Sequence, residues 1–385
     1  MPLHRKSIQV LSLLSLFAVV PLHATNGDQM IATGTKSMGM GGVSVAMPFG
    51  AESGLANPAL ITYVEGSEIS GSATFFFPDI KTSTSLDGTY HESDSSFYLM
   101  PSLQYATHLG GNVYAGLGAW GVAGMGVDFS DAPVGSGLLR MKDDLMIMHL
   151  AAPLAIREGG MSLGIAPILQ VGMLDIRYTL AGQDFHPFDK DIEANPGGVI
   201  GLAYDFGNGL ILGAKYRTPI GMRYDREGGG TLHLEQPAEA GVGFSYTYGP
   251  HTLAFDYKRI QWGSAAGYSA FGWEDQDVYA AGYQYRTDTW ALRLGYNHGR
   301  SPIDTDRTSE LQDYLNLLGF PATSENHYTV GFSYTFNEKY SFDFAAVYSP
   351  EETTDGVIHE GILGDVTIHN KHSELSVTAQ VNYRF

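Results

Sequence analysis

Residues 374–385, ELSVTAQVNYRF, decide the fold. One set of alternate positions, from Leu375 to Phe385, is apolar or aromatic, and the other set, from Glu374 to Arg384, is polar. A period of two is the pattern of a β-strand with two different faces. The same alternation recurs at 279–286 and 328–336. The chain is therefore expected to form two-faced strands.

Aromatic residues gather at the ends of these segments, on the apolar face. The pairs are Tyr246 and Tyr248, Tyr334 and Phe336, and Tyr383 and Phe385. A soluble β-sandwich also alternates, but it turns its apolar face inward and has no need of aromatic ends. Aromatic girdles at the two membrane interfaces are typical of outer-membrane barrels. The pattern favours a barrel with an apolar outer face and a polar lumen.

The composition agrees with a β-protein and excludes several classes. The chain has 48 glycines in 385 residues, 12% aromatic residues and only 16% charged residues, against roughly 25% charged in soluble proteins. After the first twenty or so residues, no apolar run approaches the roughly 18 residues of a spanning helix. The net charge of -19 argues against nucleic acid as a partner. The absence of cysteine excludes disulfides and thiol chemistry.

Connections between the strands alternate between short and long. The short turns are 110–112, 158–160, 207–209, 249–250, 287–289 and 337–339, and the long polar links are 81–93, 130–143, 181–196, 221–238, 262–276, 299–326 and 350–372. Six short and seven long connections in alternation join fourteen strands, an even number as in single-chain bacterial barrels. Both ends then face the periplasm. Helical spacing at 309–318, followed by Gly319 and Pro321, predicts a short helix in one long link.

The first 65 residues fall into two parts, neither of which fits a barrel wall. Residues 1–24 have a basic start, a short apolar core and a small-residue site ending at Ala24, which predicts a secretory signal and a mature start at Thr25. A retained anchor helix is the alternative. Residues 25–65 are Gly-rich and apolar without a period of two. Because a fourteen-strand barrel is too wide to fill its own interior, we expect them to plug the lumen of a barrel formed by 66–385; a disordered leader is the alternative.

Several short segments, in this order, match a known family. They are 26–29 (NGDQ), 40–42 (MGG), 57–62 (NPALIT), 125–131 (MGVDFSD), 256–262 (DYKRIQW), 292–296 (LRLGY) and 301–302 (SP). Together they resemble the FadL-type outer-membrane transporters of long-chain fatty acids and their toluene and xylene relatives. The resemblance implies a monomeric fourteen-strand barrel, passive uptake of hydrophobic molecules, and lateral exit through a kinked third strand. It also implies a hatch that includes Asn26, Gly27, Asn57, Pro58 and Ala59.

The sequence itself offers a place for a lateral gate. Glycines crowd the segment around Trp120, and Gly121, Gly124 and Gly126 lack side chains to close a wall and permit bulges. Lateral transfer into the bilayer keeps an apolar molecule out of water, since each buried methylene is worth about 0.8 kcal/mol. We therefore expect uptake through this gap. A structural or adhesive barrel and an open porin are the alternatives.

Candidate ligand-binding residues lie in the long links and in the lumen. The apolar ones are Phe185, Phe188, Met222, Leu232, Leu315, Leu318 and Phe320, and the basic ones, which alternation turns inward, are Lys215, Arg217 and Arg293. An Arg fork could hold a carboxylate head group. Alternatively, the inward charges, which also include Asp256, Lys258, Asp343 and Arg384, pair with one another. Fatty acid, alkane, terpene and aromatic cargo all remain open.

Catalytic and metal sites are not expected. The chain has no Gly-x-Ser-x-Gly elbow, and its 13 histidines are scattered. His369, His372 and Glu374 could hold a metal, but in a polar link they are expected to be solvated. Acidic groups at 189–193 and 274–277 lack a calcium-loop pattern and predict a hydrated rim. We expect an outer-membrane protein without enzymatic activity, cofactor or metal. Its partners would be a hydrophobic ligand, outer-membrane lipid and lipopolysaccharide, and the barrel assembly machinery.

Overall fold

The computed structural model describes residues 25–305, 310–361 and 364–385. The expected signal, 1–24, lies outside these residues. Among the helices within them, none is both long enough and apolar enough to cross a membrane.

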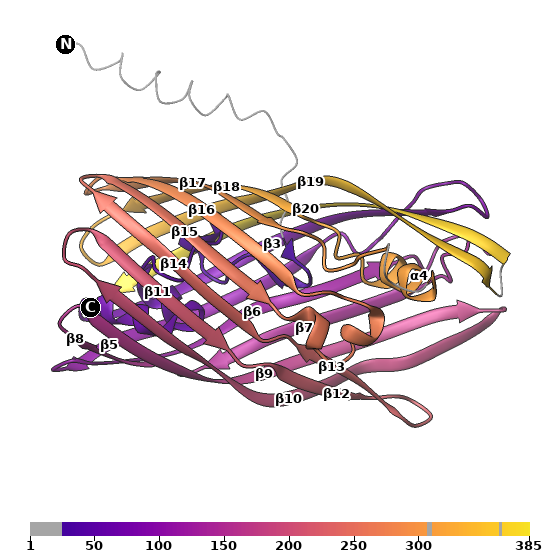
Figure 1. Cartoon of the computed structure of the whole chain (residues 1–385), viewed down its shortest axis with the longest axis horizontal. Coiled ribbons are helices and arrows are strands. Elements are labelled where there is room, and N and C mark those ends of the chain that lie inside the picture. Colours follow the sequence, from indigo (N-terminus) through magenta and orange to yellow (C-terminus); the bar gives the residue numbers. More distant parts are fainter. Residues whose placement is uncertain (1–24, 306–309, 362–363) are drawn as a thin grey trace, which may run out of the picture.

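The wall is a closed antiparallel barrel (Figure 1). Its segments are β3 (Ser67–Thr84), β5 (Tyr98–Gly110), β6 (Val113–Asp128), β7 (Lys142–Ala151), β8 (Leu154–Glu158), β9 (Met161–Leu180), β10 (Gln183–Asp205), β11 (Leu210–Arg217), β14 (Glu239–Tyr248), β15 (His251–Ile260), β16 (Gln276–Arg286), β17 (Trp290–Gly299), β18 (Asn326–Thr335), β19 (Tyr340–Gly361) and β20 (Gly364–Arg384). β7 and β8 both pair with β6 and β9, so these fifteen segments make fourteen strands. The last strand, β20, closes the barrel on the first, β3. The expected strand number is confirmed.

The two faces of the wall are as the alternation predicts. On β20, Gln380 and Asn382 are buried in the lumen, whereas Val381 between them is 55% exposed on the outer face. The apolar face is thus the one that meets lipid, and the polar face surrounds the interior. The six short turns all occur between paired neighbouring strands, at the end of the barrel opposite α4 (Glu310–Gly319) in Figure 1. By the rule for such barrels, that end is periplasmic.

Three of the expected long links consist largely of β-strands. The link 181–196 is wrong: β10 begins at Gln183 and pairs with β9 directly after a tight turn. The link 350–372 is also wrong, because β19 and β20 continue through most of it. The link 221–238 contains the hairpin β12 (Ile220–Asp225) and β13 (Thr231–Gln236). Strands that extend beyond the bilayer meet water on their outer face, so they lose the apolar alternation by which spanning strands are found.

The other long links are closer to expectation. The expected helix is confirmed as α4 (Glu310–Gly319). The link after β15 has two single turns, η4 (Trp262–Ser264) and η5 (Ser269–Phe271), and β4 (His91–Glu92) is a short strand between β3 and β5. The hairpin β12–β13, η4, η5 and α4 share one buried apolar cluster, which therefore lies at the end of the barrel opposite the short turns.

The segment before β3 is compact and lies within the barrel outline, in indigo in Figure 1. It consists of β1 (Thr25–Asn26), β2 (Gln29–Met30), α2 (Thr35–Met38), η2 (Gly50–Glu52), α3 (Ser53–Ala56) and η3 (Pro58–Tyr63). Most of its residues are buried, although no element exceeds six residues. Wall side chains provide part of the burial and bind its backbone, as described below.

Candidate functional site

The barrel wall has a gap between its second and third strands. Within the described residues, the ladder between β5 and β6 ends at the pair Ser102 and Trp120. Above this pair, β5 continues along β3, and β6 continues along β7. Pro101 begins the separated part of β5, and proline has no N–H to donate to a neighbouring strand. The two strands therefore separate at a residue that could not continue the ladder.

β6 is irregular at the same height. Its pairing with β7 shifts between Gly121 and Ala123, so Val122 is an extra residue. Such a bulge bends a strand and increases its twist. A Cβ built on Gly124 would meet only one atom within 4 Å, the carbonyl oxygen of Leu145 at 3.0 Å. The wall therefore has unfilled space beside Gly124.

The N-terminal hairpin β1–β2 occupies the free edge of β6. Gln29 of β2 pairs with Ala123, and the N–H of Gly124 donates to the carbonyl of Asp28 at 3.0 Å. The hairpin thus takes hydrogen bonds that β5 leaves unmade, over a much shorter length. A contact of this size is easier to break than a full strand ladder.

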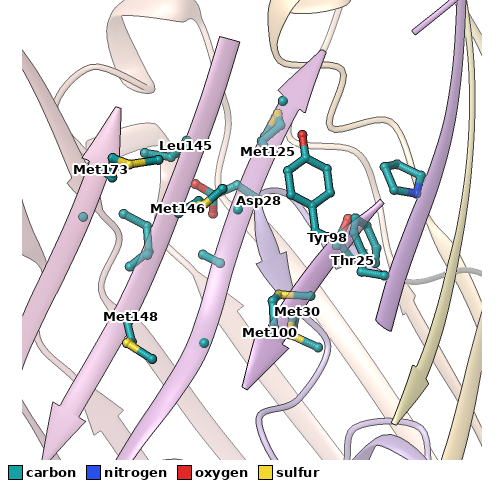
Figure 2. A pocket seen from close by; sticks show the side chains of 18 of the residues that line it. Thr25, Asp28, Met30, Tyr98, Met100, Met125, Leu145, Met146, Met148 and Met173 are labelled. Atoms are coloured by element: carbon teal, nitrogen blue, oxygen red, sulfur yellow. The ribbon is translucent and has the colours of Figure 1, made fainter. Parts of the chain in front are cut away.

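An apolar cavity of about 410 Å³ lies at this gap (Figure 2). Its lining includes six methionines from five strands: Met30, Met100, Met125, Met146, Met148 and Met173. Leu145 and Ile147 of β7 line it from the buried face, whereas Met146 between them is 45% exposed on the outer face. The cavity is therefore lined by both faces of the wall. Methionine is flexible and polarisable, and it suits surfaces that accept varied apolar shapes.

None of the few polar side chains that line the cavity carries a permanent positive charge. They are Thr25, Asp28, Tyr98, His372 and Glu374. A carboxylate head group placed here would meet two carboxyl side chains and no lysine or arginine. Like charges in a poorly hydrated site repel strongly. The lining is therefore suited to uncharged molecules.

Asp28 is held by the extracellular links. Its carboxylate accepts hydrogen bonds from the hydroxyl of Tyr268 and from Nε2 of Gln236, the latter at 2.8 Å. Burial raises the pKa of Asp28 to about 6, against the lowering effect of these two hydrogen bonds. The preceding Gly27 has a φ of 68° and lies against the ring of Trp262, which a Cβ would meet at 2.8 Å. Glycine is required here by both the backbone angle and the close approach.

The other expected hatch residues lie against β9, β10 and β11 of the wall. Nδ2 of Asn57 donates to the carbonyl of Val45 at 2.6 Å, and its Oδ1 accepts from the N–H of Ala59 at 3.1 Å. Pro58 and Ala59 approach the wall so closely that a Cβ on Gly164 would meet the Ala59 nitrogen at 2.4 Å. Asn26, in β1, is buried and belongs to the gap region rather than to this contact.

Carboxylates of the wall bind the backbone of the N-terminal segment. Asp256 accepts from the N–H groups of Ser44 and Val45 at 2.6 and 2.8 Å. Glu68 accepts from the N–H of Ala51 at 2.9 Å. The sequence interpretation missed this role. A signal was available in the sequence. Acidic residues lie on the lumen face of the strands, and the N-terminal segment has too little regular structure to satisfy its own backbone N–H groups.

The basic lumen residues are engaged within the protein. Lys215 and Arg217 both pair with Glu239, at 2.6 and 3.3 Å. Arg293 donates to Oε1 of Gln284 at 2.8 Å and to Oγ of Ser333 at 2.6 Å. For Lys215 and Arg217, these contacts correspond to ion pairing within the wall and not to a clamp for a ligand carboxylate.

The apolar link residues are distributed between burial and exposure. Phe188, Met222 and Leu318 are buried in the apolar cluster at the extracellular end, and Leu232, Leu315 and Phe320 pack against it. Phe185 is 38% exposed and stacks on Tyr178 with ring centroids 5.2 Å apart. Six of the seven thus belong to or pack against one apolar cluster, and the three buried ones have little surface left for a ligand.

Of the four residues expected at the lateral gate, three line the cavity and one packs beside it. Gly121, Gly124 and Gly126 line the cavity. Trp120 is fully buried on the lumen face, with its ring over Gly118, where a Cβ would lie 2.3 Å from it. It packs beside the gap, at the last pair of the ladder.

The groups considered for metal binding differ from expectation. His369, His372 and Glu374 lie on β20 rather than in a loop. His372 and Glu374 are buried, so the expectation that they are solvated is wrong. Within the described residues, Asp175, His186 and Asp189 bring ligand atoms within 4.8 Å of one another. Arg177 already donates to both oxygens of Asp175, at 3.2 and 2.9 Å, and supplies the positive charge there.

The sequence is similar to those of known outer-membrane proteins. A family model described as Gram-negative porin matches residues 177–317. A 47 kDa outer membrane protein of Pasteurella multocida is 22% identical over 86% of this chain and 87% of its own length. Sequence similarity is thus low but extends over most of both chains.

Solved structures give a stronger likeness. A FadL homologue of Pseudomonas aeruginosa has a TM-score of 0.74 at 15% identity, over 95% of this chain and 100% of its own. This chain has the fold of that FadL homologue. The FadL-type fold also relates it to the Pseudomonas putida toluene transporter TodX, with a TM-score of 0.72 at 18% identity over 94% and 100% of the two chains. The Ralstonia pickettii toluene transporter TbuX has a TM-score of 0.68 at 18% identity over 92% and 98%.

Proposed function

We propose that this FadL-type barrel is a passive uptake channel for uncharged hydrophobic small molecules, which leave it sideways into the outer membrane. The observation that carries the proposal is the apolar cavity at the gap between β5 and β6, lined from both faces of the wall. The toluene transporters and the FadL homologue of the same fold support it. It acts as a channel and not as an enzyme.

The energetics favour lateral exit over release into the periplasm. A cargo molecule in the cavity already lies among methionine, leucine and isoleucine side chains. Transfer from there to the bilayer keeps it in apolar surroundings. Release into water would cost about 0.8 kcal/mol for each methylene re-exposed, which is large for any cargo of several carbons. A side opening lets a passive channel work without this loss.

The proposal includes a plug formed by residues 25–65. Its backbone is bound by wall carboxylates, and Asn57, Pro58 and Ala59 pack on the small residues of β9 and β10. A plug closes the direct route to the periplasm, so that cargo must turn sideways. This distinguishes the proposal from an open porin. An adhesive barrel has no need of an apolar cavity that reaches the lipid.

The charge of the lining supports uncharged cargo over carboxylates. The basic residues that the sequence offers as a carboxylate clamp already have partners. Lys215 and Arg217 pair with Glu239, and Arg293 donates to Gln284 and Ser333. The cavity contributes the carboxyl groups of Asp28 and Glu374 instead. Its volume of about 410 Å³ compares with roughly 150 Å³ for an engineered cavity that holds benzene. Alkylated arenes, terpenes and short alkanes fit this range.

The partners follow from the proposed role. The protein acts as a monomer, folded with the help of the barrel assembly machinery, and lipid and lipopolysaccharide surround its apolar face. Residues 1–24 serve as the signal that directs it to this route, and no cofactor or nucleic acid takes part.

The test is uptake by a deletion strain complemented with this chain. Labelled toluene, a labelled terpene and a labelled long-chain fatty acid are supplied separately, and uptake is normalised to folded barrel at the surface. The proposal expects the two uncharged compounds to enter at least several-fold faster than in the uncomplemented strain, with little gain for the fatty acid. Equal rates with and without the chain for all three would refute it.

A further inference from the structure

Thr25, the residue after the expected cleavage site, is buried among polar side chains of the wall. Its backbone nitrogen lies 3.0 Å from Nε2 of His327 on β18. Its hydroxyl donates to Oε1 of Glu374 on β20 at 2.5 Å. All three residues are buried, and Nε2 of His372 lies 3.3 Å from the same Glu374 oxygen. The start of the mature chain is therefore surrounded by hydrogen-bond acceptors.

This surrounding is suited to a positive charge. A buried carboxylate is costly unless hydrogen bonds and an opposite charge accompany it. Cleavage between Ala24 and Thr25 converts the Thr25 nitrogen from an amide with one donor into an ammonium group with three. The nitrogen and hydroxyl of one threonine are joined through two carbons, so Glu374 lies within about 6 Å of the new charge. At such a distance the attraction is substantial in a site with little water.

We propose that the mature chain begins at Thr25 and that its α-ammonium group is bound between His327 and Glu374 as a latch for the N-terminal hairpin. The site recognises a free amino terminus of this chain. His327 accepts one N–H, and Glu374 supplies the opposite charge and holds the hydroxyl of the same residue. His327 and Glu374 thus recognise both the charge of the terminus and the hydroxyl of its side chain.

The latch is continuous with the gap in the wall. Thr25 pairs with Met30 in the hairpin, and Gln29 beside Met30 pairs with Ala123 of β6. Thr25, Glu374 and His372 also line the apolar cavity. Because the ammonium group is paired with the Glu374 carboxylate, it adds no net positive charge to the lining, which stays suited to uncharged molecules. Release of the terminus would remove one end of the hairpin that covers the free edge of β6. The latch itself requires only the expected cleavage, whereas its effect on uptake rests on the proposed lateral exit.

The first test measures the terminus directly and needs no cargo. The intact mass of the purified barrel is expected to correspond to a chain starting at Thr25. A small amine acetylating reagent is then applied to the folded protein in detergent, and acetylation of the α-amine is followed by mass spectrometry. We expect the folded protein to react at least tenfold more slowly than the unfolded protein. A different first residue, or equal rates in the two states, would overturn the latch.

Two variants separate the latch from general stability. Glu374→Gln keeps the shape but removes the charge, and its α-amine is expected to react several-fold faster than that of Glu338→Gln, a control in an exposed turn. A glycine inserted between Ala24 and Thr25 leaves the barrel sequence intact and moves the amine by one residue, so it is also expected to react faster. Protection unchanged in both variants would contradict the latch. Protection without any cargo uptake would refute the proposed function and leave the latch standing.

Discussion

Replacing Gly124 with tryptophan is expected to close the lateral route while leaving the barrel folded. Gly124 pairs with Met146, which is 45% exposed on the outer face, so a side chain at 124 points toward the lipid side of the cavity. A Cβ there meets only the carbonyl oxygen of Leu145 within 4 Å, at 3.0 Å. The first atom of the new side chain thus requires a shift of only a few tenths of an ångström, and the ring extends over the cavity mouth.

The size of the effect follows from burial. An indole ring packed over the methionines must be displaced each time a cargo molecule leaves. Moving a large apolar side chain off an apolar surface costs about 2 to 3 kcal/mol. A barrier raised by this amount slows exit roughly 30- to 140-fold, since each 1.4 kcal/mol is a factor of ten. Strand propensity rises when glycine is replaced by an aromatic residue, so folding is expected to change by less than about 1 kcal/mol.

The assay is uptake of labelled toluene, normalised to heat-modifiable, folded barrel in outer-membrane fractions. The matched control is Gly71→Trp on β3, where a Cβ meets only Leu103 at 3.8 Å and where the paired Leu103 and Val381 are exposed to lipid. This control adds the same ring to the outer face away from the cavity and is expected to transport normally. Wild-type uptake in a folded Gly124→Trp protein would refute the lateral route. Loss of uptake in both variants would show that an added ring alone impairs the wall.

Three further predictions concern the N-terminal segment. Burial raises the pKa of Asp28 to about 6 from 3.8. Protonation therefore favours the seated hairpin below that pKa, and the preference fades as the pH rises through it. Linkage gives on the order of 1 kcal/mol more seating at pH 5 than at pH 7.5. Uptake at pH 5 is expected to be several-fold slower than at pH 7.5, and Asp28→Asn, measured across the same range, is expected to remove the difference. Deleting 25–65 after the signal is expected to give an open pore, and planar-bilayer conductance as low as that of the intact chain would contradict the plug. Asn57→Ala is expected to lower the free energy of unfolding of the plug by about 1 to 3 kcal/mol, since buried carbonyls lose their donor, and hydrogen exchange at η3 would detect it.

The barrel could be predicted from the sequence because spanning strands follow a simple physical rule. Lipid on one side and a polar lumen on the other impose a period of two, as on β20, and the short turns divide the strands. The rule fails beyond the bilayer. There β10 and β19 continue with their outer face in water instead of lipid, so Gln183 and the residues after it carry no regular apolar alternation. The expected loops at 181–196 and 350–372 were wrong for this reason.

The candidate site was only partly predictable. The glycines of β6 marked the position of the gap, because missing side chains are visible in a sequence. The methionines around it were not found, since they come from strands far apart in the chain and each has the ordinary apolar character of a wall residue. Asp28 was also missed. Its role depends on Tyr268 and Gln236, more than 200 residues away, and no local pattern connects them.

The arrangement of the hairpin suggests how a closed wall can pass cargo without opening as a barrel. Parting two full strands would break a ladder such as that of β5 and β6, which has eight register pairs. At the gap, β5 has already left. The edge of β6 is covered by one register pair with its flanking backbone hydrogen bond, and the hairpin is held by the polar contacts of Thr25, Asp28 and Gln29. Each such hydrogen bond is worth about 1 kcal/mol net. Under the proposed lateral exit, thermal motion would release the hairpin while the strands on either side keep their pairing, and the polar contacts that hold it would set how often the exit is open.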